Sequence, residues 1–187
     1  RTPASRRNRG PRPEGLAMAQ PRLPQVASVF LYGEDGRDDG LEALHIEPLR
    51  ERSMRHHWVI GAHRHPEHVQ FMLLSEGGAV TRFEEVELRP ARRCLVIHPA
   101  ALVHSIQYKE GSEGMTITVS LAYLKELSRA LPEADALLAV PRVIELATSY
   151  DEIARIYAQI LQESTRKPLG WRAKIGALML SLLVELI

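Results

Sequence analysis

The chain of 187 residues contains a single cysteine, Cys94. One cysteine cannot build an internal disulfide framework, so the small disulfide-stapled secreted scaffolds are excluded, and this usage suits a reducing cytoplasm. Cys94 opens the apolar run 94–97. We therefore expect a buried thiol that packs as a small hydrophobic group.

Long apolar runs are missing as well. No segment reaches the ~18–20 uninterrupted apolar residues of a membrane helix. The most apolar stretch, 177–187, is shorter and contains Ser181 and Glu185. No apolar segment follows the N-terminal arginines, as it would in a signal peptide. The sequence therefore predicts a cytoplasmic protein with no membrane partner.

Motifs of nucleophilic catalysis and of phosphate binding are absent too. There is no Gly-x-Ser-x-Gly and no glycine-rich phosphate loop. These absences favour a binding module over an enzyme of those classes.

The net charge of +1 hides an asymmetry between the two ends of the chain. Residues 1–24 hold six arginines and five prolines against one acidic residue, so we expect a disordered basic leader. Residues 25–187 carry 18 basic and 22 acidic residues and no basic helix. These residues alone give no reason to expect DNA binding.

Residues 25–121 have the pattern of a β-domain. Short apolar or alternating segments separated by turn residues predict a sandwich or barrel. Gly77 and Gly78 predict a tight hairpin turn, because glycine accepts positive φ. The expected strands are 28–32, 43–46, 58–60, 69–74, 79–83, 86–88, 95–98, 105–108 and 115–120.

Residues 122–187 change to the 3.6-residue period of helices. Apolar residues from Ile153 to Leu161 fall on one helix face, and Ser149 precedes Glu152 with capping-box spacing. After a break at 167–170, a second helix is apolar on more than one side. Burial against its own barrel and a subunit interface both fit that helix, and we expect a homodimer through it. The pattern continues to the last residue, which predicts a chain cut at a domain boundary.

The candidate site centres on histidines in the β-domain. Residues two apart in a strand share a face, so His63 and His65 point together, and Gln70 shares its face with Met72. Three imidazoles, with His104 as the third, can hold Zn²⁺ or Fe²⁺. Gln70 supplies an amide where a carboxylate would balance the charge, so we expect no cofactor. A divalent metal, if one binds, would be held by these three histidines.

Two other uses of the same side chains remain open. Imidazoles and an amide can form hydrogen bonds to a small polar ligand against an apolar wall. Alternatively, the histidines only satisfy polar groups at the end of the barrel. The remaining histidines have no such constellation and are expected at the surface or in turns; they include His45, His56, His68 and His98.

The spacing of these residues resembles the two motifs of the cupin superfamily. His63, His65, Gln70 and Gly77 match the first motif, with Gln70 where glutamate is usual. Residues 99–104 match the second motif. Four residues depart from the two motifs: Ala101, His57 and Arg93 replace glycines, and Tyr108 replaces an asparagine.

A narrower resemblance covers nearly all of the foldable chain. A degraded cupin barrel and two helices, the second opening at 168–172, resemble the N-terminal effector-binding half of AraC-type transcription regulators. Segment 52–65 looks like the PobR-like branch, which responds to phenolic acids such as 4-hydroxybenzoate. The resemblance implies a mainly β fold: a cupin-like (jelly-roll) barrel followed by two or three helices.

The resemblance also implies partners. It implies an aromatic carboxylic acid effector, a homodimer, and promoter DNA bound only through a C-terminal helix-turn-helix domain that this chain lacks. Arg52 matches the branch motif, and Arg55 would share a face with His63 if that strand began early. Trp58 alternates outward by parity unless a bulge intervenes. The predicted effector-binding residues are His63, His65, Gln70, Met72, His104, Arg52, Arg55 and Trp58.

The sequence thus predicts the sensing domain of a bacterial transcription regulator, with domains at 1–24, 25–121 and 122–187. The alternative is a metal-dependent cupin enzyme, a dioxygenase or isomerase, that uses the three histidines. A purely structural dimerisation domain is a third reading.

Overall fold

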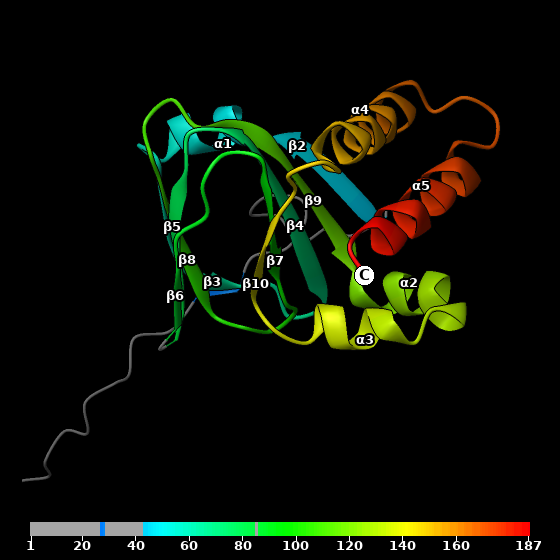
Figure 1. Ribbon diagram of the computed structural model, residues 1–187, viewed down its shortest axis with the longest axis horizontal. Coiled ribbons are helices and arrows are strands. Elements are labelled where there is room, and N and C mark those ends of the chain that lie inside the picture. The colour runs from blue at the N-terminus through cyan, green and yellow to red at the C-terminus, as the bar shows by residue number, and fades with distance from the viewer. Residues whose placement is uncertain (1–26, 29–42, 85) are drawn as a thin grey trace, which may run out of the picture.

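The computed structural model describes residues 27–28, 43–84 and 86–187 (Figure 1). The predicted leader 1–24 and most of the predicted strand 28–32 lie outside the described residues. In chain order the elements are β1 (Ala27–Ser28), β2 (Leu44–Pro48), α1 (Leu49–Arg55), β3 (Val59–Arg64), β4 (His68–Glu76), β5 (Ala79–Phe83), β6 (Val86–Leu88), β7 (Cys94–His98), β8 (His104–Tyr108), β9 (Glu113–Ser120), α2 (Leu121–Leu127), the 3₁₀ turn η2 (Ser128–Ala130), α3 (Glu133–Leu138), β10 (Arg142–Glu145), α4 (Tyr150–Arg166) and α5 (Trp171–Glu185).

The strands form two five-stranded sheets. One sheet has the order β1-β3-β8-β5-β6, and the other has the order β10-β7-β4-β9-β2. Helices α2 to α5 lie on one side of the molecule, next to the second sheet (Figure 1). The fold is mainly β with C-terminal helices, a cupin-like jelly-roll, and the predicted fold class is confirmed, although four helices (α2 to α5) follow β9 where two or three were predicted.

Strand β4 lies at the centre of the second sheet and is buried on both faces. Val69, Phe71 and Leu73 join a hydrophobic cluster with the helices. Met72 and Leu74 join a second cluster between the two sheets. A strand covered on both faces reads as a continuous apolar run, and 69–74 is such a run apart from Gln70.

Helix α4 packs against β4 through the apolar face that the periodicity predicts. Ile153, Ile156 and Ile160 are buried, and Tyr157 is completely buried. The Tyr157 hydroxyl donates a hydrogen bond of 2.9 Å to the carbonyl of Phe71. Burial raises the pKa of Tyr157 well above its usual value, so this donor keeps its proton.

The predicted capping box at the start of α4 is wrong. Ser149 has helical backbone angles, and its side chain makes no capping hydrogen bond. Its carbonyl accepts from the Ile153 N–H instead, as in an ordinary helical turn. The helix is therefore held by its buried face rather than by a side-chain cap.

Helix α5 packs against the other helices and the sheet. Ile175, Met179 and Leu182 are buried, whereas Val184 is about half exposed. The Lys174 ammonium forms an ion pair of 2.5 Å with the nearly buried carboxylate of Glu163 in α4. Within the described ranges, none of the helices has the length and apolar content required to span a bilayer.

The predicted turn at Gly77 and Gly78 forms, but it does not make a hairpin. Gly77 has φ +83°, and a Cβ at this position would overlap the buried side chain of Ser112. Strands β4 and β5 flank the turn and belong to different sheets, so they do not pair with each other. The turn instead carries the chain from one layer of the barrel to the other.

Strand β10 and helix α1 were not foreseen. β10 follows α3 and returns to the barrel, where it pairs antiparallel with β7 at the sheet edge. β10 has only four residues, which is too few for an alternation of apolar and polar residues to be recognised in the sequence. Helix α1 occupies a segment for which the sequence patterns predict no helix or strand. Its Leu49 packs into the cluster between the sheets.

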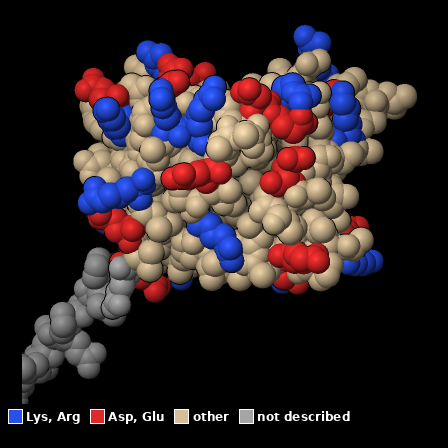
Figure 2. All heavy atoms as spheres, in the orientation of Figure 1, with Lys and Arg blue, Asp and Glu red and all other residues tan. Residues whose placement is uncertain are grey.

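Acidic and basic side chains lie interspersed over the face shown in Figure 2. No single-sign patch dominates that face. This distribution matches the mixed composition of the folded part of the chain.

At three positions where the cupin motif has glycine, this chain has another residue but still adopts the left-handed backbone conformation. The φ angles are +50° at His57, +56° at Arg93 and +64° at Ala101. The Ala101 N–H donates a hydrogen bond of 2.8 Å to the carbonyl of His65. Such φ values cost an L-residue roughly 1–2 kcal/mol, so surrounding contacts hold the shape that glycine would adopt freely.

Replacing Ala101 by glycine therefore tests this strain. We expect Ala101→Gly to raise the free energy of unfolding by about 0.5–1 kcal/mol, after the extra chain entropy of glycine is subtracted. Chemical denaturation measures the change. The neighbouring Ala100→Gly, where φ is not positive, is the matched control and should destabilise. Equal destabilisation by both variants would show that Ala101 is not strained.

Cys94 gives a second test, because burial raises the pKa of its thiol to about 11. The thiol donates a hydrogen bond to the carbonyl of Ala91. We expect alkylation by iodoacetamide at pH 8 to be about 100-fold slower in the folded protein than in urea, because only the thiolate reacts. Mass spectrometry of timed samples measures both rates. Equal rates in the two conditions would contradict the buried position.

Candidate ligand-binding site

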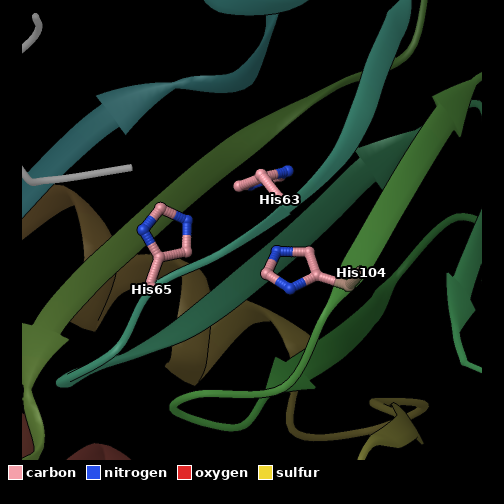
Figure 3. A group of neighbouring side chains, drawn as sticks. All are labelled: His63, His65 and His104. Atoms are coloured by element: carbon pink, nitrogen blue, oxygen red, sulfur yellow. The ribbon is translucent and has the colours of Figure 1, made fainter. Parts of the chain in front are cut away.

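Three of the predicted histidines meet between the two sheets. His63 lies opposite His104 in the β3–β8 pair, and His65 follows the end of β3. Each is at most 4% exposed. The ring centroids are 4.3 Å apart for His63 and His104 and 5.6 Å apart for His65 and His104. The rings gather in one region of the barrel interior (Figure 3).

Backbone carbonyls fix the protonation of two of these rings. His63 Nδ1 lies 2.8 Å from the carbonyl oxygen of Gly61, and His104 Nδ1 lies 3.0 Å from that of Leu102. A carbonyl oxygen only accepts, so Nδ1 carries the proton in both rings. In the neutral form of each ring the lone pair is then on Nε2, as in histidines that bind metals or hydrogen-bond donors.

A fourth histidine joins the cluster, and the prediction that His98 is a surface or turn residue is wrong. His98 is 1% exposed, lies opposite Gln70 in the β4–β7 pair, and has its ring centroid 4.8 Å from that of His104. Alternation along β7 places it on the inner face with Cys94. That alternation was the signal in the sequence. The other three predicted surface or turn histidines are exposed or half-buried: His45, His56 and His68.

The hydrogen bonds of His98 are incomplete. Its Nε2 lies 3.2 Å from the hydroxyl oxygen of Thr81, which donates its own proton to the carbonyl of Ser105. Nδ1 is buried and has no hydrogen-bond partner among the described residues. Burial lowers the pKa of His98 well below 6.5, and the neighbouring imidazoles of His104, His63 and His65 lower it further.

Gln70 and Met72 lie on the inner face, as alternation predicts. The Gln70 amide donates a hydrogen bond of 3.1 Å to the Thr118 hydroxyl in the neighbouring strand. Tyr108, which stands at the asparagine position of the cupin motif, donates to the Met72 sulfur at 3.3 Å. Gln70 thus has a structural partner and still borders the interior.

A small cavity borders the cluster. Its volume of about 10 Å³ is room for one water-sized group. None of the described residues that line it is acidic. The lining residues are Ile60, His63, Gln70, Met72, His98, Ile106, Tyr108 and Thr116.

The predicted outward orientation of Trp58 is wrong, and a bulge in β3 explains the difference. The register of β3 against β8 shifts between Ile60 and His63, so both side chains border the cavity although they are three residues apart. Trp58 packs against the cluster between the sheets, not outward. It does not line the cavity that His63 borders.

The two predicted arginines lie in helix α1 rather than in a strand. The strand β3 begins at Val59, so Arg55 does not share a strand face with His63. The side chains of Arg52 and Arg55 lie outside the described part of the structure. Their predicted role in effector binding stays a prediction.

The three histidines are the residue type that binds a divalent metal, but no described carboxylate near them compensates its charge. The candidate ligand atoms of the three predicted histidines lie within 4.8 Å of one another. In a tetrahedral site two bonds of about 2.1 Å hold two nitrogens about 3.4 Å apart, so the rings would have to move closer together to bind one ion. No described carboxylate belongs to the cluster. A metal bound by His63, His65 and His104 would act as a Lewis acid.

No protein-family model matches the chain, and no curated protein sequence matches it. Solved structures do show similarity. The AraC-like transcriptional activator CuxR is 10% identical with a TM-score of 0.46, and the match covers 75% of this chain and 48% of CuxR. A cupin-2 domain protein from Shewanella frigidimarina is 13% identical with a TM-score of 0.33, over 41% and 68% of the two chains.

The Mn(II)-containing oxalate decarboxylase of Bacillus subtilis is a third such structure. It is 21% identical with a TM-score of 0.29, and the match covers 33% of this chain. The match spans only 18% of the decarboxylase chain. Structures of this kind thus include both a transcription activator and a metal enzyme.

The lowered pKa of His98 predicts a pH dependence of stability. The unfolded chain binds a proton near pH 6.5 that the folded protein excludes, so stability falls as the pH drops below that value. We expect the free energy of unfolding to fall by up to about 1.4 kcal/mol per pH unit for this one proton. Urea titrations at pH 7, 6 and 5 measure the slope.

Two variants test whether His98 causes the slope of the free energy of unfolding against pH. His98→Gln removes the titrating ring and should reduce the slope by about one proton. Val96→Ala, on the same face of β7, destabilises without removing a titrating group and should keep the slope. An unchanged slope in His98→Gln would contradict the assignment.

Proposed function

We propose that the chain is a small-molecule sensing domain of an AraC-type transcription regulator. The proposed effector is an aromatic hydroxy acid such as 4-hydroxybenzoate, bound at the histidine cluster. The observation that carries the proposal is the chemistry of the interior. Imidazole, amide and hydroxyl groups converge there beside Met72, and no described acidic residue lines the cavity.

The protonation pattern favours a ligand with a hydroxyl group. His63 and His104 offer Nε2 lone pairs, because their Nδ1 protons are engaged by carbonyls. A phenolic hydroxyl donates to a neutral imidazole of this cluster without a change of charge. A carboxylate would need a proton on the imidazole, so Arg52 and Arg55 remain the proposed partners of the carboxylate.

Space for the aromatic ring has to come from movement of the walls. The cavity of about 10 Å³ holds one small group and not a benzene ring. Met72 has three rotatable bonds, and Ile60 sits beside the bulge of β3, so these two side chains are the ones that would yield. Opening of this kind is a ligand-dependent change of shape, as a sensor requires.

The regulator proposal includes partners. The outer side of α5 exposes Val184 and, in part, Leu180, and we propose that this side forms a homodimer. Promoter DNA would be bound by a separate C-terminal domain. The proposed division of the chain is a leader at 1–24, the barrel at 25–121 and the helical region at 122–187.

A metal-dependent enzyme is the second candidate, and the fixed tautomers favour it. Imidazoles held as Nδ1–H donors to backbone carbonyls are typical of zinc and iron ligands. The candidate ligand residues are His63, His65 and His104. Against it stands Gln70, an amide at the position where a carboxylate would neutralise the ion.

A ligand screen tests the proposal. We expect 4-hydroxybenzoate at one hundred times its Kd to stabilise the protein by about 2.7 kcal/mol and to raise Tm by several degrees. His104→Ala should lose the shift. His56→Ala, at an exposed position, is the control and should keep it.

Native mass spectrometry with elemental analysis completes the test, because it reports ligand, metal and oligomer together. Stoichiometric iron, manganese or zinc with turnover would overturn the sensor and support the enzyme. No stabilisation by any hydroxylated benzoate at millimolar concentration would overturn the ligand class.

A further inference from the structure

We propose that His98 forms a subsite that binds the hydroxyl group of the ligand and selects for it. This subsite deepens the proposed function and rests on it. In this orientation the hydroxyl end of the ligand lies innermost, toward β7, and the carboxylate end lies toward the mouth of the barrel.

The first argument is the position of His98. It is the last residue of β7, it is 1% exposed, and its Nδ1 is buried without a hydrogen-bond partner among the described residues. An unsatisfied buried polar atom costs about 1–3 kcal/mol, so such an atom in a native interior calls for an explanation. His98 also lines the cavity beside Gln70 and Thr116.

The second argument is the direction of the hydrogen bonds. The carbonyl of Ser105 accepts from the Thr81 hydroxyl, so the proton of that hydroxyl is used. The contact of 3.2 Å between Thr81 and His98 Nε2 then requires the proton on Nε2. Nδ1 of His98 is therefore a lone-pair acceptor. A group that binds it must donate a hydrogen bond, as a hydroxyl does and a carboxylate does not.

The third argument is size. The cavity of about 10 Å³, which His98 lines, takes one oxygen-sized group. The hydroxyl oxygen of a phenol has that size, and the aromatic ring would follow toward the other histidines. A water molecule has the same size, so the test must separate a structural water from a ligand hydroxyl.

Two substitutions separate the two nitrogens of the ring. His98→Gln places its amide near the position of Nε2 and so keeps the contact with Thr81 while it loses Nδ1. His98→Asn places its amide oxygen near Nδ1 and loses the contact with Thr81. A purely structural histidine depends on the contact with Thr81, and a ligand-binding one depends on Nδ1.

The experiment measures the Kd of 4-hydroxybenzoate and of benzoate by calorimetry for the full chain and both variants. The native protein should bind 4-hydroxybenzoate about tenfold more tightly than benzoate, because benzoate leaves a buried acceptor unpaired. In His98→Gln the ratio should fall below about threefold, and in His98→Asn it should stay near the native value.

The possible outcomes distinguish failure of the His98 subsite from failure of the proposed sensor function. If the native protein prefers 4-hydroxybenzoate and His98→Gln keeps the full preference, the subsite is wrong and the sensor proposal stands. Loss of the preference only in His98→Asn would assign His98 a structural role and also overturn the subsite. Failure of the native protein to bind either acid would overturn the proposed ligand class together with its subsite.

Discussion

The whole architecture depends on one constraint, the burial of strand β4 on both faces. Phe71 faces the helices and Met72 faces the opposite sheet, so neither layer can be removed without exposing an apolar strand. At roughly 25 cal/mol per Å² of apolar surface, exposure of either face would cost several kcal/mol. The barrel and the helical region therefore stabilise the same strand, and the site lies on its inner side.

The inner side of β4 becomes polar at one end of the barrel. Gln70 and His98 face His63 and His104 across the space between the sheets, and the apolar cluster around Met72 and Leu74 lies beyond them, together with Thr116. Backbone carbonyls and neighbouring hydroxyls fix the orientation and the protons of these groups. With neutral rings, these groups present hydrogen-bond acceptors to the interior. Such a set suits a hydroxyl donor or a metal ion. It disfavours a carboxylate, because the carboxylate oxygen and the imidazole nitrogen would both be acceptors.

Sequence patterns predicted most of the strands and the inward direction of Gln70 and Met72, because alternation is a local property. The α4 face was predictable for the same reason. Besides β10, α1 and the capping box, three features were not predicted correctly. The bulge that turns Trp58 inward breaks the alternation, the turn at Gly77 joins two sheets rather than two paired strands, and His98 looked isolated because its partners lie far away in the chain. The bulge and the turn depend on tertiary contacts that no short window contains, whereas alternation along β7 did indicate the inward direction of His98.

The hydrogen bond between Tyr157 and Phe71 has a mechanical consequence. Its acceptor is the carbonyl of the residue that lies between Gln70 and Met72, and its donor is the centre of α4. A change of twist in this stretch of β4 is therefore transmitted to the helix layer by a directional bond of 2.9 Å, not only by apolar contact. The backbone beside the histidine cluster is thus hydrogen-bonded directly to the helix layer.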